Sequence, residues 1–151
     1  MVRAGGHDGS MRPPLAEVLD LRPHPEGGWY RETWQAGERV RTDDGRDRST
    51  GTLILFLLPA GESSRWHRVA SDEIWLAHRG VVALEFGGDG PRPQPGQVVS
   101  IGIDPAADQR PQLLVPAGTW QRTLPSETDG LVSCVVSPGF DFEDFELVPD
   151  S

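Results

Sequence analysis

Short apolar runs separated by turn residues follow one another along most of the chain. Between residues 28 and 34 bulky and charged side chains alternate, which places Tyr30 and Glu32 on the same face of a predicted strand. Residues 50–58 are apolar and β-rich, a pattern typical of a strand that is covered on both faces. Turn signals at regular spacings are typical of an all-β sandwich or barrel. Further strands are predicted at residues 64–69, 73–77, 81–86, 97–103, 112–115, 120–124 and 131–137.

The two ends and one internal segment depart from this pattern. Residues 14–19 predict one short helix, because proline is favoured in the first turn of a helix. Residues 38–49 are charged and rich in turn residues, which predicts an exposed loop or a hairpin tip. We expect a flexible tail at residues 1–12 and a single domain over residues 13–151. Near the end of the chain aromatic and acidic side chains alternate, which predicts an edge strand or a short closing helix anchored by Phe140, Phe142 and Phe145.

Composition and charge narrow the class of protein. The formal net charge is −9, from 23 acidic and 14 basic residues, so the chain repels polyanions and we expect neither a nucleic-acid nor a membrane partner. All the basic residues are arginine, which excludes Schiff-base chemistry on a lysine. The single cysteine, Cys134, cannot form an internal disulfide. No apolar run reaches the length of a membrane helix and the first residues lack a secretion signal, so we expect a cytoplasmic protein.

The strongest chemical signal lies between Gly61 and Gly80. Five residues separate Gly61 from His67, one separates His67 from Val69, three separate Val69 from Glu73, and six separate Glu73 from Gly80. This spacing resembles the first motif of the cupin superfamily, in which two histidines and a glutamate from adjacent strands point into a β-barrel. Val69 stands where the motif has its second histidine.

A second stretch resembles the other cupin motif. Pro116, Gly118 and Gln121 have the spacing of that motif, and Gln121 stands in place of its histidine. Several longer segments are similar to a small one-domain cupin family of unknown function, namely residues 23–33, 67–69, 72–75, 116–121 and 134–145. The resemblance covers about residues 19–147. It implies an all-β, single-domain cupin jelly-roll β-barrel, RmlC-like, with one short N-terminal helix here, and usually a homodimer.

The same motifs bear on a metal site. Metal-dependent cupins offer three histidines and a carboxylate, whereas the ligands that remain here are His67, Glu73 and Gln121. Glu73 and His78 are five residues apart, so on a regular strand they point to opposite faces, and His24 could substitute only if the fold brings it inward. We therefore expect no cofactor. The alternative is a divalent metal held by His67, Glu73 and Gln121.

Without a metal, the predicted chemistry is proton transfer. Histidine has its ordinary pKa near neutrality, and Glu73 beside His67 would orient the ring, so the two form a predicted acid–base pair. Tyr30 could donate or accept a proton at the opposite wall. The cupin resemblance supports this role, because sugar epimerases of this fold use a similar pairing of histidine and tyrosine in a different sequence context. Cys134 is predicted to be a small buried hydrophobic residue. Polar or aromatic side chains predicted to contact the substrate are Arg31, Glu32, Trp66, Trp75, Gln112, Trp120 and Gln121.

These residues favour an enzyme that acts on a small molecule, as an isomerase, epimerase, cyclase or dehydratase in carbohydrate or secondary metabolism. Two alternatives stay open. The chain could be a cupin that binds a small ligand and catalyses nothing, in which case His67 and Glu73 could simply pair in the interior. It could also be a divalent-metal-dependent cupin enzyme such as a dioxygenase.

Overall fold

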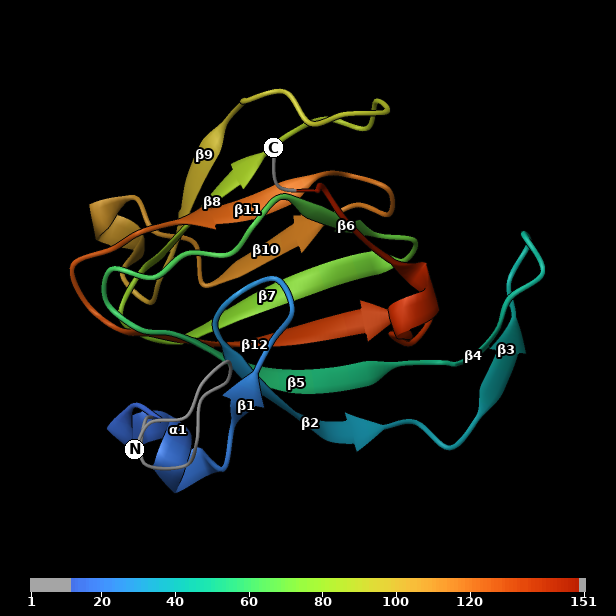
Figure 1. Cartoon of the computed structure of the whole chain (residues 1–151), viewed down its shortest axis with the longest axis horizontal. Coiled ribbons are helices and arrows are strands. Elements are labelled where there is room, and N and C mark those ends of the chain that lie inside the picture. Colours follow the sequence, from blue (N-terminus) through green and yellow to red (C-terminus); the bar gives the residue numbers. More distant parts are fainter. Residues whose placement is uncertain (1–11, 150–151) are drawn as a thin grey trace.

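The computed structural model describes residues 12–149, which form two antiparallel sheets and a small hairpin (Figure 1). The six-stranded sheet has the order β1 (Arg22–Pro23), β2 (Trp29–Gln35), β5 (Thr52–Leu58), β12 (Gly130–Ser137), β7 (Asp72–Arg79) and β10 (Gln112–Val115). The five-stranded sheet has the order β13 (Phe145–Leu147), β6 (His67–Val69), β11 (Gln121–Leu124), β8 (Val82–Phe86) and β9 (Val98–Ile101). The hairpin pairs β3 (Arg39–Arg41) with β4 (Asp47–Ser49). The predicted all-β architecture is confirmed.

Strand β5 explains why residues 50–58 are apolar. Phe56 and Leu58 belong to the main core, which also contains side chains from β7, β8, β9 and β12 and therefore joins the two sheets. Leu57 points the other way, into a second cluster with Trp29 and Ala16. Both faces of the strand are thus covered, as the sequence pattern predicts. A side chain such as Phe56 or Leu57 contributes about 1.5–3 kcal/mol to the free energy of folding when it is fully removed from water.

The second cluster is completed by helix α1 (Pro14–Leu19), which has the predicted bounds. Its C-cap residue Asp20 adopts a left-handed conformation (φ 57°), and the chain then turns so that the Leu21 N–H donates to Ala16 O at 2.8 Å. Of the predicted tail, residues 1–11 lie outside the described residues; Arg12 Nη1 donates to Leu21 O at 2.8 Å. Within residues 12–149 no helix is long and apolar enough to cross a membrane.

The end of the chain contains both elements that its sequence left open. A 3₁₀ helix, η3 (Phe142–Asp144), is followed directly by the edge strand β13. Strand β13 pairs with β6, with Leu147 opposite His67 and Phe145 opposite Val69. The closing segment therefore lies beside the strand that carries the motif histidine.

A second 3₁₀ helix, η2 (Pro105–Ala107), lies between β9 and β10.

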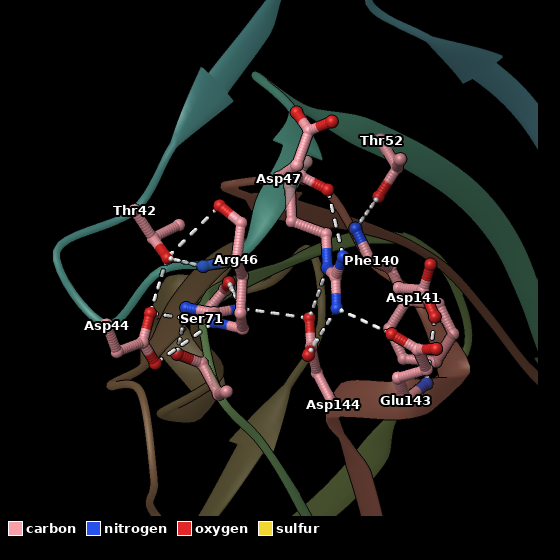
Figure 2. A network of polar contacts seen from close by, with 12 residues as sticks. Thr42, Asp44, Arg46, Asp47, Thr52, Ser71, Phe140, Asp141, Glu143 and Asp144 are labelled. Atoms are coloured by element: carbon pink, nitrogen blue, oxygen red, sulfur yellow. Dashed lines mark hydrogen bonds and ion pairs between the residues drawn. The ribbon is translucent and has the colours of Figure 1, made fainter.

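The charged segment 38–49 forms the β3–β4 hairpin, and two of its arginines reach the closing segment (Figure 2). Arg48 binds Asp144 through two hydrogen bonds, Nε to Oδ2 and Nη2 to Oδ1, each 2.9 Å long. Arg46 Nη1 donates to Asp144 Oδ2, also at 2.9 Å. The Asp144 side chain is only 4% exposed. These bonds hold η3 against the hairpin. The hairpin is one of the two structures predicted for this segment, but its contact with the closing segment was not predicted.

Candidate functional site

A cavity of about 450 Å³ lies beside η3 and β13. Strands β2, β5, β7 and β12 of the larger sheet and β6 and β13 of the smaller sheet contribute its walls. The turn before β2 and the segment that leads into η3 complete the lining. Cavities of this volume are typical of sites for small molecules.

His67 forms a buried pair with Glu26 at one wall of the cavity. Its Nδ1 lies 2.6 Å from Arg65 O, and because a carbonyl can only accept, Nδ1 carries a hydrogen. In the neutral ring Nε2 is then an acceptor, and it faces Glu26 Oε1 at 3.2 Å. The two side chains are 2% and 7% exposed. The contact therefore requires one proton between Glu26 and Nε2.

Burial decides where that proton lies. Removal from water, with the nearby charge of Glu73 as a second cause, raises the pKa of Glu26 well above its ordinary value. Removal from water also lowers the pKa of His67 to about 4, although its hydrogen bond to Arg65 O opposes the shift. Both shifts favour the uncharged pair at neutral pH, in which the Glu26 carboxyl donates to His67 Nε2.

Glu73 has a separate set of partners. Trp75 Nε1, which can only donate, lies 3.1 Å from Gln121 Oε1, so the amide nitrogen of Gln121 faces Glu73 Oε1, to which it donates at 2.7 Å. Burial raises the pKa of Glu73, against the hydrogen bonds from Gln121 and Cys134. Burial also raises the pKa of the Cys134 thiol well above its ordinary value. Cys134 is buried, as predicted, and it lines the cavity.

The structure therefore brings both predicted acid–base residues to one cavity but gives each a different partner. We predicted that His67 would pair with Glu73. Instead His67 lies against Glu26, because β6 and β7 belong to different sheets and diverge after a two-residue turn. Glu26 reaches His67 from the turn before β2, where Glu26 O accepts a hydrogen bond from the Arg65 N–H at 2.7 Å.

Two of the predicted contact residues, Glu32 and Trp75, line the cavity together with the predicted proton-transfer residue Tyr30, and Gln121 lies behind its wall. Tyr30 and Glu32 project from the same face of β2, as the alternation predicts, and Trp75 projects from β7. Gln121 is 1% exposed and acts on the cavity through Glu73.

The other predicted contact residues lie outside the cavity lining, which corrects their placement. Arg31 is on the opposite face of β2, where its Nε donates to Leu19 O at 2.9 Å. Gln112 is exposed on the edge strand β10. Trp66 and Trp120 lie under arginine guanidinium groups, at 4.5 Å and 4.3 Å from the ring centroids. Strand alternation and these cation–π contacts direct the four side chains elsewhere.

Two further residues, His24 and Glu26, line the cavity. From the sequence, His24 was considered only as a substitute metal ligand and Glu26 was given no role. They lie in a turn whose Gly27 and Gly28 have φ of 113° and 77°. A Cβ on Gly27 would lie 2.5 Å from Ser63 O, and one on Gly28 2.6 Å from the Phe56 ring. The glycines let the turn lie tight against the barrel, which pushes both polar side chains inward. In the sequence, His24 and Glu26 stand among prolines and glycines. Such a segment has no strand periodicity, so the sequence does not show which way these side chains point.

The side chains present do not fit a cupin metal centre. A glutamine binds a metal through its amide oxygen, and Gln121 Oε1 is occupied by the Trp75 indole N–H. Val69, which lines the cavity, offers no ligand atom. Among residues 12–149 no group of three or more His, Cys, Asp or Glu side chains has a geometry suited to a metal ion.

Comparisons with known proteins give a consistent result. The profile of the family described as Cupin superfamily (DUF985) matches residues 14–148. An uncharacterized protein of Saccharomyces cerevisiae, YML079W, is 32% identical over 150 residues, which cover 86% of this chain and 71% of that protein. Two solved structures are similar. A hypothetical protein from Leishmania major has a TM-score of 0.80 and 33% identity and covers 89% of this chain and 85% of its own. Protein SO0799 from Shewanella oneidensis has a TM-score of 0.77 and 34% identity, and the match covers 91% of this chain and 85% of that protein.

Proposed function

This chain belongs to the DUF985 family of the cupin superfamily, and from that premise we propose that it is an enzyme that moves protons on a small molecule bound in the cavity. The reaction classes that fit are isomerisation, epimerisation and cyclisation next to a carbonyl group. One observation carries the proposal: His67, Glu26 and Glu73 converge on one cavity, and all three are buried and have pKa values moved by burial. Titratable groups perturbed in this way are concentrated at functional sites.

The two carboxyl groups suit opposite tasks. Glu26 holds a proton that it shares with His67 Nε2, so this pair is a proton donor at neutral pH. Glu73 has a raised pKa, which makes its carboxylate a stronger base than a solvated one. In the proposed step a carbon next to a carbonyl gives its proton to Glu73, and the carbonyl oxygen receives a proton from the Glu26–His67 pair. Return of a proton to carbon, with return of the oxygen-bound proton to the Glu26–His67 pair, restores the carbonyl group and completes the isomerisation. No oxidant or reductant is required.

Tyr30 also lines the cavity, and its hydroxyl group can donate or accept a proton. It projects from β2, which β5 and β12 separate from β7, the strand of Glu73. This separation supports a role for Tyr30 in returning a proton to the face of the carbon opposite Glu73. Epimerisation requires such delivery from a second side.

The experiment measures exchange of carbon-bound hydrogen with solvent. A panel of uncharged hydroxyaldehydes, hydroxyketones and sugars is incubated with the protein in D₂O and followed by ¹H NMR. We expect the wild type to replace hydrogen by deuterium next to the carbonyl of at least one compound, and His67→Ala and Glu73→Gln to slow this exchange by about 10²-fold or more.

Two variants outside the cavity are matched controls. His78, whose Nε2 contacts Ser133 Oγ, and Glu127, which is exposed, do not line the cavity. His78→Ala and Glu127→Gln should keep the wild-type exchange rate within about twofold. Exchange that survives His67→Ala and Glu73→Gln contradicts the assignment of these residues. Compounds that bind to the wild type without exchange would instead identify a binding protein with no catalytic activity.

A further inference from the structure

His24 lies at the centre of an aromatic cluster that fixes its ring. The ring centroid is 4.6 Å from that of Tyr30, 5.9 Å from Phe56, 5.7 Å from Phe145 and 6.0 Å from Phe142. The first three contacts are edge-to-face, with interplanar angles of 66°, 88° and 66°. Aromatic neighbours on several sides leave the ring little freedom to turn. The direction of its two nitrogens is therefore set by packing.

Hydrogen bonding then sets the tautomer. The Glu26 backbone N–H donates to His24 Nδ1 at 3.1 Å, and an amide N–H cannot accept, so Nδ1 carries a lone pair and Nε2 carries the hydrogen. The pKa of His24 is lowered to about 3, first by burial and then by the nearby His67, so the ring is uncharged at neutral pH. His24 Nε2 is thus a neutral donor of fixed direction.

This donor has no partner in the protein. Among residues 12–149 His24 Nε2 makes no hydrogen bond. The His24 side chain is 6% exposed. Its Nε2 keeps some accessible surface, because the only fully buried side-chain nitrogen or oxygen without a partner in residues 12–149 is Arg12 Nε. His24 lines the cavity, which is where the accessible Nε2–H can meet a ligand. An unpaired buried donor is unfavourable, so a ligand that supplies an acceptor for it binds more tightly.

The charge of the lining limits what that ligand can be. Carboxyl groups of Glu32, Glu73 and Asp141 line the cavity, beside the uncharged Glu26. Within the described part of the chain no arginine lines it, and the whole sequence has no lysine. A carboxylate or phosphate that entered would lose its hydration and meet groups of its own sign without a counter-ion. Sugar phosphates, nucleotides and carboxylic acids are therefore poor ligands.

We infer that the ligand carries no negative charge and has a carbonyl or hydroxyl oxygen that accepts a hydrogen bond from His24 Nε2. The inference rests on the proposed function in taking this cavity as the substrate site. It gives His24 a catalytic role beyond that proposal. When Glu73 removes a proton from the neighbouring carbon, negative charge develops on the oxygen that His24 already contacts, and a fixed neutral donor stabilises that charge until the Glu26–His67 pair protonates the oxygen.

The test uses two probes that share a skeleton and differ in charge, 2-phenylacetamide and phenylacetate. Both carry a carbonyl oxygen and an aromatic ring for the phenylalanine side chains. Binding at pH 7 is measured by protein-observed NMR titration of the whole chain. We expect the amide to shift resonances of lining residues and phenylacetate to bind at least 10-fold more weakly. Equal or tighter binding of phenylacetate overturns the inference, as does the absence of amide binding at its solubility limit.

Two substitutions test the hydrogen bond itself. In His24→Asn the shorter amide can still accept from the Glu26 N–H but leaves the position of Nε2 empty, so amide binding should weaken about fivefold. In His24→Gln the longer side chain returns an N–H near that position, so binding should stay within about twofold of the wild type. Unchanged binding by a folded His24→Asn, or equal loss in both variants, contradicts the inference. The assay needs no turnover, so a negative deuterium-exchange result would refute the proposed function and leave this result standing.

Discussion

Replacement of Asp144 by alanine tests how the closing segment is held against the cavity. The side chain of Asp144 is 4% exposed and accepts three hydrogen bonds of 2.9 Å from Arg46 and Arg48, whose side chains are 18% and 12% exposed (Figure 2). Exposed ion pairs contribute about 0.2–1 kcal/mol, whereas removal of one partner from a buried pair costs about 3–5 kcal/mol. The geometry here lies near the buried limit. We expect Asp144→Ala to lower the free energy of unfolding by about 3 kcal/mol.

The assay is urea denaturation followed by tryptophan fluorescence, with Glu143→Ala as the matched control. Glu143 also contacts Arg48, at 3.3 Å, but it is 80% exposed, so its loss should cost no more than about 0.5 kcal/mol. In a thermal scan the Asp144 variant should melt about 6–12 °C lower than the wild type. Since Asp144 lies between Phe142 and Phe145 at the cavity wall, the variant should also bind 2-phenylacetamide more weakly.

Acid pH provides an independent check on Asp144. Its hydrogen bond from Arg48, then the bond from Arg46, lower its pKa, and burial opposes them only in part. A carboxyl group with a lowered folded-state pKa stabilises the protein above its unfolded pKa of about 3.9, and this contribution is lost as the pH falls through the folded value. The wild type should therefore lose stability below about pH 4 more steeply than Asp144→Ala. A variant that matches Glu143→Ala in stability, or parallel pH profiles, would refute the reasoning.

Further predictions concern the cavity and the assembly. Because burial raises the pKa of Cys134, the native thiol should react with a small thiol reagent at least about 10-fold more slowly than the thiol of the unfolded chain, and equally fast reaction would contradict this. Phe145 has a partly buried ring that contacts His24 and His67, so Phe145→Ala should lower the free energy of unfolding by about 2 kcal/mol in a denaturant titration. A loss below about 0.5 kcal/mol would show that the ring does not support the site. A chelator should leave the melting temperature unchanged; a marked decrease would show that a bound metal contributes to stability. The homodimer that the family resemblance implies should give twice the chain mass in light scattering.

The fold was predictable because its signals are local. Alternation at Tyr30 and Glu32 assigns one face of β2 to the cavity, and the continuous apolar run of β5 reflects its two buried faces. Proline at the start of α1 marks the beginning of that helix. Such periodic patterns depend on neighbouring residues alone, so a sequence displays them directly.

The partners within the site were not predictable in the same way. Glu26 meets His67 across 41 positions of the chain, through a turn whose direction depends on the close packing of Gly27 and Gly28. The spacing of His67 and Glu73 suggested that they form a pair, but their strands run in different sheets. The tautomer of His24 depends on a single backbone N–H. Tertiary packing, rather than residue spacing, determines each of these contacts.

The protonation state of His67 tests the account most directly, because the proposed chemistry depends on a neutral ring that accepts the proton of Glu26. The measurement is ¹⁵N NMR of the two ring nitrogens in histidine-labelled protein. At pH 7 we predict a hydrogen on Nδ1, directed at Arg65 O, none on Nε2, and a ring that becomes charged only near pH 4. A ring with both nitrogens protonated at pH 7, or with its hydrogen on Nε2, would contradict the account.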